Sequence, residues 1–176
     1  IATHFGRGAV TVIDARGDAP VLSDAVDGLF QRNVNTGVLS TSAVAIRPNY
    51  AQPDAPGLAY IGSSGEDRIQ TAVVVADYYD QAKLLAADYF FVHGVGSNSG
   101  GGADTRGLAF DSHQRMYLVG RAPASVLQYD VSLDETGQPR RAMLSGADTC
   151  RQATAMVVVP AGDATHWHAS ARRNRR

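Results

Sequence analysis

The chain alternates between short apolar runs and clusters of turn-forming residues, and this pattern is clearest over residues 102–131. Three runs in this stretch are rich in Val, Leu, Tyr and Phe: 107–110, 116–119 and 125–131. They are separated by Asp, Gly and Pro-containing breakers at 111–114 and 120–123. Short runs of this composition, bounded by turn residues, predict β-strands. Three strands at such close spacing predict an antiparallel meander.

Similar runs on both sides of this stretch predict further strands. Before it they are 1–5, 9–15, 20–26, 42–46, 58–61, 69–77 and 83–92, and after it 141–145 and 154–159. Residues 83–92 suit a helix or a strand, and their aromatic side chains favour the strand. The intervening segments 28–41, 49–56 and 94–102 are polar or rich in Gly and Pro, and we expect loops there.

The predicted strands recur with a long period. Strand starts that resemble one another fall at Ser42, Arg106 and Thr154. Strands that end in Asp finish at Asp14, Asp77 and Asp130. The tetrapeptide GADT occurs at 102–105 and again at 146–149, with an arginine just after each copy. Four-stranded units that recur every forty to sixty or so residues are typical of β-propeller blades.

The segment RGLAFDSHQRMYLVGRAPASVLQYDV resembles a blade of the β-propellers of YVTN/NHL type, a group that is also similar to the six-bladed gluconolactonase-like hydrolases. FGRGAVTVID and GLAYIGSSGEDRIQTAVVVAD resemble the second half of such a unit, and CRQATAMVVVP resembles its first strand. The resemblance covers roughly residues 1–163. It implies an all-β propeller with about three four-stranded blades in this chain, and a bacterial periplasmic or secreted location.

Three blades leave sheet edges and apolar faces open, which favours aggregation. One hypothesis is a homodimer, in which strand 154–159 of each copy completes the first blade of the other and closes six blades. The alternative is that the chain is a piece of a longer propeller. We assign 1–163 to the blades and 164–176 to a basic tail that does not continue the repeat and is disordered or non-native.

Composition excludes some classes of function. The formal net charge is -1, so we do not expect a nucleic-acid-binding protein. No apolar run is long enough to span a bilayer, so we expect no membrane partner. Cys150 is the only cysteine, which rules out a disulfide within the chain and leaves the redox compartment open.

In propellers of this kind, function usually lies on the face that surrounds the central channel. Chemically capable residues that we expect on this face are Arg7, Asn33, Asn35, Glu66, Asp67, Arg68, His93, Asp104, Arg106, Arg121, Asp148, Cys150, Arg151 and Gln152. The resemblance implies one use for them, a divalent-cation site for Ca²⁺ or another metal. Its oxygen donors would be Asp104, Asp148, Asn33 and Asn35. The alternative is that each Asp-Thr pair only caps a turn.

Two further hypotheses use other residues of this face. Cys150 is a candidate nucleophile with His93 as its base, although a lone cysteine is more often a small buried apolar residue. Arg106, Arg151 and Gln152 form a candidate anion site, because guanidinium groups suit carboxylates and phosphates. We therefore expect a module that binds a small molecule or a protein on its channel face, with no certain cofactor. The alternative is a hydrolase of lactones, esters or phosphotriesters that uses the metal or Cys150.

Overall fold

The computed structural model describes residues 1–4, 6–30, 41–47, 57–92, 104–121, 123–161 and 164–171. These residues form an all-β structure, with no helix among them. Their 13 strands are β1 (Ala2–His4), β2 (Ala9–Asp14), β3 (Val21–Val26), β4 (Thr41–Arg47), β5 (Leu58–Ser63), β6 (Arg68–Ala76), β7 (Ala82–Phe91), β8 (Thr105–Phe110), β9 (Arg115–Arg121), β10 (Ala124–Asp130), β11 (Ala142–Asp148), β12 (Ala153–Ala161) and β13 (Ala164–Ala171).

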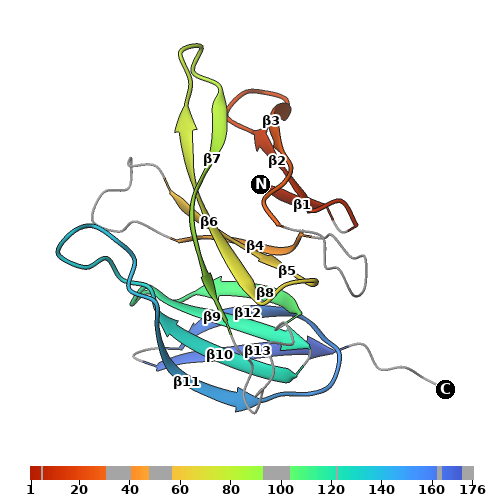
Figure 1. The fold of residues 1–176 in the computed structure, drawn as a ribbon, viewed down its shortest axis with the longest axis vertical. Helices are drawn as coiled ribbons and strands as arrows, with labels where there is room; N and C mark the ends of the chain where they lie inside the picture. The colour runs from red at the N-terminus through yellow and green to blue at the C-terminus, as the bar shows by residue number, and fades with distance from the viewer. Residues whose placement is uncertain are drawn as a thin grey trace.

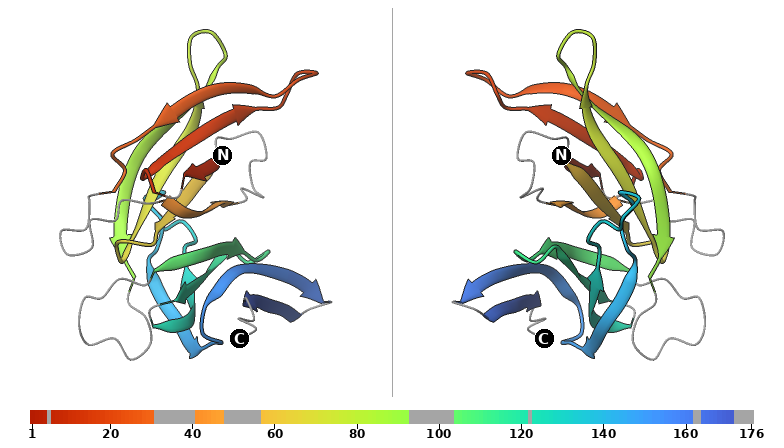
Figure 2. Two further views of the ribbon diagram at one scale, coloured as in Figure 1. Left: turned by 90° about the vertical axis from the view of Figure 1, so that its right-hand side faces the viewer. Right: turned by 90° about the vertical axis from the view of Figure 1, so that its left-hand side faces the viewer.

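The strands form four antiparallel sheets, and within each sheet they pair in the order of the sequence. Sheet 1 contains β1–β3, sheet 2 contains β4–β7, sheet 3 contains β8–β11, and sheet 4 contains β12 and β13. The sheets follow one another from the N-terminal sheet to the C-terminal sheet (Figures 1 and 2). The first strands of neighbouring sheets lie together, because β4 contacts β8 and β8 contacts β12. The arrangement is open, and the described strands do not close into a ring.

An irregularity in strand pairing recurs at the start of three sheets. The register shifts between Thr41 and Ala43 in β4, between Thr105 and Gly107 in β8, and between Ala153 and Ala155 in β12. The skipped residues are the three at which the sequence analysis placed equivalent strand starts: Ser42, Arg106 and Thr154. A bulge bends a strand and redirects one side chain. The three residues therefore occupy corresponding positions, each near the start of the first strand of its sheet.

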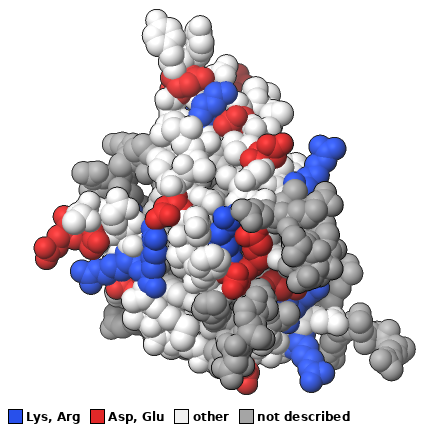
Figure 3. All heavy atoms as spheres, in the orientation of Figure 1, with Lys and Arg blue, Asp and Glu red and all other residues white. Residues whose placement is uncertain are grey.

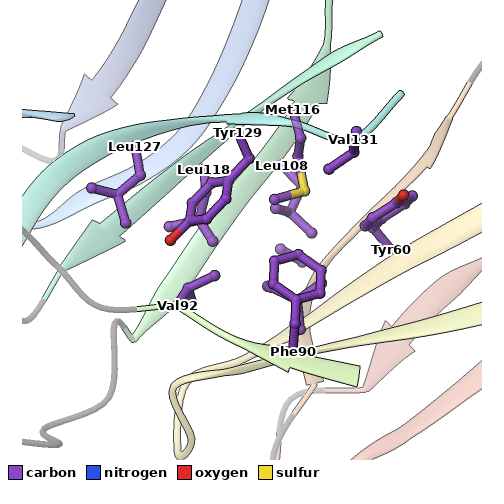
Figure 4. Close-up of a cluster of buried hydrophobic side chains, with 11 residues drawn as sticks. Tyr60, Phe90, Val92, Leu108, Met116, Leu118, Leu127, Tyr129 and Val131 are labelled. Atoms are coloured by element: carbon purple, nitrogen blue, oxygen red, sulfur yellow. The ribbon is translucent and has the colours of Figure 1, made fainter. Parts of the chain in front are cut away.

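The largest buried cluster lies between sheets 2 and 3 (Figure 4). Its centre is aromatic: the ring of Tyr60 packs edge-on against Phe110 at 5.2 Å and against Phe90 at 6.4 Å. Phe90 in turn meets Tyr129 at 5.8 Å. A second cluster, which includes Val10, Phe30 and Ile61, lies between sheets 1 and 2. The two clusters thus lie on opposite faces of sheet 2, which explains why every residue of β5 after Leu58 is buried.

A five-residue turn occurs three times at the end of the sheets opposite to the bulges. The three turns start at Asp77, Asp111 and Asp134. In each turn the aspartate accepts hydrogen bonds from the backbone N–H groups two and four residues later. The residue three places after the aspartate has a left-handed backbone in all three: Asp80, Gln114 and Gly137. A short side chain that bonds the backbone just ahead of it is a stable way to close such a turn.

The structure agrees with the predicted strands, including the ambiguous segment 83–92, which forms β7. It differs at the C-terminus, where Ala164–Ala171 of the assigned tail forms β13 and pairs along the whole of β12. In the dimer hypothesis, β12 of one copy pairs with the first strand of a second copy. In this structure β13 pairs along one edge of β12.

Candidate functional site

The charged residues named by the sequence analysis gather where β8 begins, and we call this region the Asp104 end. It comprises Glu66–Arg68, Asp104–Arg106, Arg121 and Asp148–Gln152. Antiparallel pairing brings the last three of these segments together, since Thr105 lies opposite Gly120 and Ser125 lies opposite Asp148. The hydroxyl of Ser42 donates to the carbonyl of Thr105 and joins the first strands of sheets 2 and 3.

Asp104 lies between two guanidinium groups at this end. One carboxylate oxygen is 2.7 Å from Nε of Arg106, and the other is 3.3 Å from Nε of Arg121. The side chains of Asp104 and Arg106 are 17% and 15% exposed, whereas that of Arg121 is 35% exposed. We call Asp104, Arg106 and Arg121 the Asp104 trio. With one negative and two positive charges, the trio has a net charge of about +1 at neutral pH. Arg121 is its most accessible member.

Arg68 forms a second charged group in the neighbouring sheet. Its Nε lies 3.2 Å from Glu66, and its Nη2 donates to the carbonyl of Leu29 at 2.6 Å. The guanidinium also lies over the rings of Phe30 and Tyr89, at 5.3 and 4.9 Å from their centroids. Cation–π contacts and a fixed carbonyl hold this arginine in one place. It therefore braces sheets 1 and 2, and we assign it a structural role.

Two of the predicted site residues share an unusual backbone. Asp104, just before β8, has a φ of 36°, and Gln152, just before β12, has a φ of 62°. Residues other than glycine are uncommon in this left-handed region. Because Thr105 and Ala153 are equivalent bulge positions, Asp104 and Gln152 are also equivalent. The structural counterpart of Asp104 is thus Gln152, and not Asp148 as the repeated GADT tetrapeptide suggested.

The remaining predicted residues of this end are more exposed. Asp148 is the last residue of β11, and Cys150 and Arg151 follow it at the surface. The hydroxyl of Thr149 lies 3.8 Å from the sulfur of Cys150. No contact in the described residues joins Cys150 to an acid or a base. The proposed base His93 and the proposed donors Asn33 and Asn35 lie outside the described residues.

A metal site requires several ligands at one point. Within the parts of the chain that the structure describes, no three side chains of His, Cys, Asp or Glu come together in this way. Asp104, the best-placed carboxylate, is already engaged by Arg106 and Arg121. The arrangement therefore suits an anionic ligand better than a cation.

Arg121 is the residue whose role the sequence analysis underestimated. It was placed on the functional face but not assigned to the anion site. Arg121 is the last residue of β9 and pairs with Ala124 across the turn into β10. A pair between Arg121 and Asp104, which lie 17 residues apart, depends on the β8–β9 register, and a single sequence does not reveal it.

Acidic and basic side chains lie side by side over the face in Figure 3, without a large area of one sign. Among the described residues, no helix is long and apolar enough to cross a membrane. No protein-family model, curated protein or solved structure matched this chain.

Proposed function

We propose that the chain is a propeller-type binding module whose Asp104 end holds a ligand through an oxyanion, a carboxylate or a phosphate. The observation that supports this most is the Asp104 trio. A carboxylate that forms ion pairs with two guanidinium groups holds them in place, and the more exposed of the two, Arg121, can donate to a second anion. The exposed edge of Arg121 is then the first point of contact.

Three features support a repeat architecture of blade type. Sheets 2 and 3 are both four-stranded meanders, the bulges recur at Ser42, Arg106 and Thr154, and the first strands of successive sheets lie together. In such an architecture, loops from different blades converge at one end. The proposed ligand site needs only β8, β9 and their connections, so it does not depend on ring closure by a second copy.

The hydrolase alternative has less support. A nucleophilic cysteine needs a base within reach of its sulfur, and the described contacts of Cys150 are limited to the hydroxyl of Thr149. Binding without turnover is the simpler function for the Asp104 trio, since its three side chains are held by one another.

The experiment is a thermal-unfolding titration with citrate and with inorganic phosphate at fixed ionic strength, with glucose as the neutral comparison. We expect both anions to raise the Tm saturably, because a ligand that binds only the folded state stabilises it. Arg121→Gln should weaken the apparent affinity by about tenfold to a hundredfold, since a charge-assisted hydrogen bond contributes roughly 1.5–3 kcal/mol.

Arg140→Gln is the matched control, because Arg140 is exposed and lies outside the Asp104 end. It should titrate like the unmodified protein. A Tm shift that is as large with glucose, or that survives unchanged in Arg121→Gln, contradicts the proposal.

A further inference from the structure

Arg47 is a buried cation that has no anionic partner among the described residues. It is the last residue of β4 and is only 6% exposed. Its Nη1 donates to the amide oxygen of Gln114 at 2.8 Å, and its Nε is buried without a hydrogen-bond partner. None of the ion pairs found in the described part of the chain includes Arg47. A buried charge is costly unless an opposite charge accompanies it.

The hydroxyl of Tyr60 is a second buried group without a partner, and it lies on the same face of sheet 2. In the β4–β5 pairing Tyr60 is opposite Ala45 and Arg47 is opposite Leu58. Arg47 and Tyr60 are therefore diagonal neighbours on the face that packs against sheet 3, within reach of each other for long side chains. Tyr60 is fully buried, and its oxygen has no hydrogen-bond partner. Figure 4 shows this oxygen at the edge of the apolar cluster, on the side away from Leu127.

A second guanidinium lies near the same hydroxyl. The guanidinium of Arg141 is 5.8 Å from the centroid of the Phe90 ring, which packs edge-on against Tyr60. Burial raises the pKa of Tyr60 to about 12, and the positive charges of Arg47 and Arg141 act in the opposite direction. Arg141 is neutralised by its ion pair with Asp88. The uncompensated charge at this place is therefore that of Arg47, about +1 at neutral pH.

The acidic residue nearest in the chain to Gln114 does not compensate this charge. It is Asp111, whose carboxylate binds the guanidinium of Arg115 and the hydroxyl of Tyr117. An ordered water could satisfy the hydrogen bonds of Arg47 and Tyr60, as buried waters do elsewhere. Water would leave the charge of Arg47 without a counter-ion, whereas an anion supplies both the acceptor and the opposite charge.

We propose that Arg47, Tyr60 and Gln114 form a site for a small monovalent anion of the halide class, which we call the Arg47 site. The anion accepts from Nε of Arg47 and from the hydroxyl of Tyr60, and chloride is the expected occupant. Burial of both residues selects a small ion over citrate or phosphate. Because the site joins β4 and β5 to the β8–β9 turn, the bound ion braces sheets 2 and 3. It uses no residue of the Asp104 trio.

The first test is thermal unfolding of the full chain while sodium chloride replaces sodium gluconate at constant ionic strength. We expect the Tm to rise saturably with chloride, by about 3 °C or more at about 300 mM. Arg47→Met should abolish this rise. Tyr60→Phe should weaken the apparent affinity for chloride about tenfold or more, because it removes a hydrogen bond to a charged acceptor. Each variant is compared with itself in gluconate, where this bond is absent.

Two control variants separate the Arg47 site from other effects of salt. Arg140→Met removes an exposed arginine and should keep the whole chloride effect. Arg121→Gln should keep it too, so failure of the Arg47 site and failure of the Asp104 end are distinguishable. Tyr60→Phe retains the packing of the ring and serves if Arg47→Met does not fold. The same Tm in chloride and gluconate, or a chloride effect that is unchanged in Tyr60→Phe, overturns the proposal.

Anomalous diffraction from crystals grown with sodium bromide is the complementary test, because bromide replaces chloride and its position can be identified directly. We expect a bromide peak in contact with Nε of Arg47 and the hydroxyl oxygen of Tyr60. A water molecule at this place, with bromide found only on the surface, contradicts the site.

Discussion

The carboxylate of Asp111 accepts hydrogen bonds from both the backbone N–H and the guanidinium of Arg115, at 2.9 and 2.6 Å. The Asp111 side chain is fully buried, whereas Arg115 is 34% exposed. The same carboxylate also receives the hydroxyl of Tyr117 at 3.2 Å and the N–H of His113 at 2.9 Å. The buried carboxylate of Asp111 thus closes the β8–β9 turn and also binds Tyr117 within the sheet.

We expect Asp111→Ala to lower the free energy of unfolding by about 2 to 3 kcal/mol, because several donors lose a buried charged acceptor. Urea denaturation measures this loss. Asp134→Ala is the matched control, since Asp134 closes the same kind of turn at the surface. It should lose clearly less, because water can replace an exposed carboxylate. Equal losses in the two variants contradict this explanation.

We predict that removing the hydroxyl group has different effects on stability at two buried tyrosines, Tyr117 and Tyr60. The hydroxyl of Tyr117 donates to Asp111 and accepts from Nε2 of Gln128 at 2.8 Å. The hydroxyl of Tyr60 is buried without a hydrogen-bond partner in the described structure. Burial raises the pKa of Tyr60 to about 12. Tyr117→Phe should therefore lower stability by about 1 to 2 kcal/mol, and Tyr60→Phe should leave it unchanged or raise it.

Chemical denaturation of both variants, with the m-value as a check on the unfolding mechanism, measures these differences. The aromatic packing around Tyr60 is retained in phenylalanine, so a large loss in Tyr60→Phe would mean that its hydroxyl has a partner after all.

Gly107 allows β8 and β12 to approach each other. A Cβ at this position would lie 2.9 Å from the backbone nitrogen of Met156, which belongs to the first strand of the next sheet. Because a backbone atom cannot move aside easily, Gly107→Ala should destabilise the fold by about 1 to 3 kcal/mol. Gly17→Ala is the control, since nothing lies within 4 Å of a Cβ there. Thermal unfolding compares the two, and a neutral Gly107→Ala would show that sheets 3 and 4 are not packed this closely.

The sequence predicted the strands well because each is defined by a local pattern: β-branched and aromatic runs between turn residues. Segment 83–92 formed a strand for the same reason. Non-local relationships were much harder to predict. The GADT copies look equivalent, yet Thr105 starts β8, whereas Gly146 and Asp148 lie inside β11. Local similarity does not fix strand register, and a small shift changes which residues are equivalent.

The same limit applies to the candidate site. The repeated GADT tetrapeptide and the arginine after it made Asp104 a candidate metal ligand and Arg106 a candidate anion-site residue, but the ion pair between Asp104 and Arg121 depends on strand pairing.

Stability should fall at acidic pH, because the fold depresses the pKa values of several carboxyl groups. Hydrogen bonds from Arg16 lower the pKa of Asp14 from 3.8 to about 2. Bonds from Arg141, Ser132 and Thr136 lower those of Asp88, Asp130 and Asp134, respectively. Between the unfolded and folded pKa values, the unfolded chain binds more protons than the folded chain, so stability rises with pH there.

The stabilisation from these groups is therefore complete above about pH 5 and is lost as the pH falls from about 4 towards 2. Urea midpoints measured at successive pH values give the slope. Asp14→Asn should flatten the acid limb, because the variant has no carboxyl group to protonate at that position. Asp18→Asn is a suitable control, since Asp18 lies in the same exposed turn region. An acid limb that is unchanged in Asp14→Asn would show that the Arg16 pair does not persist in solution.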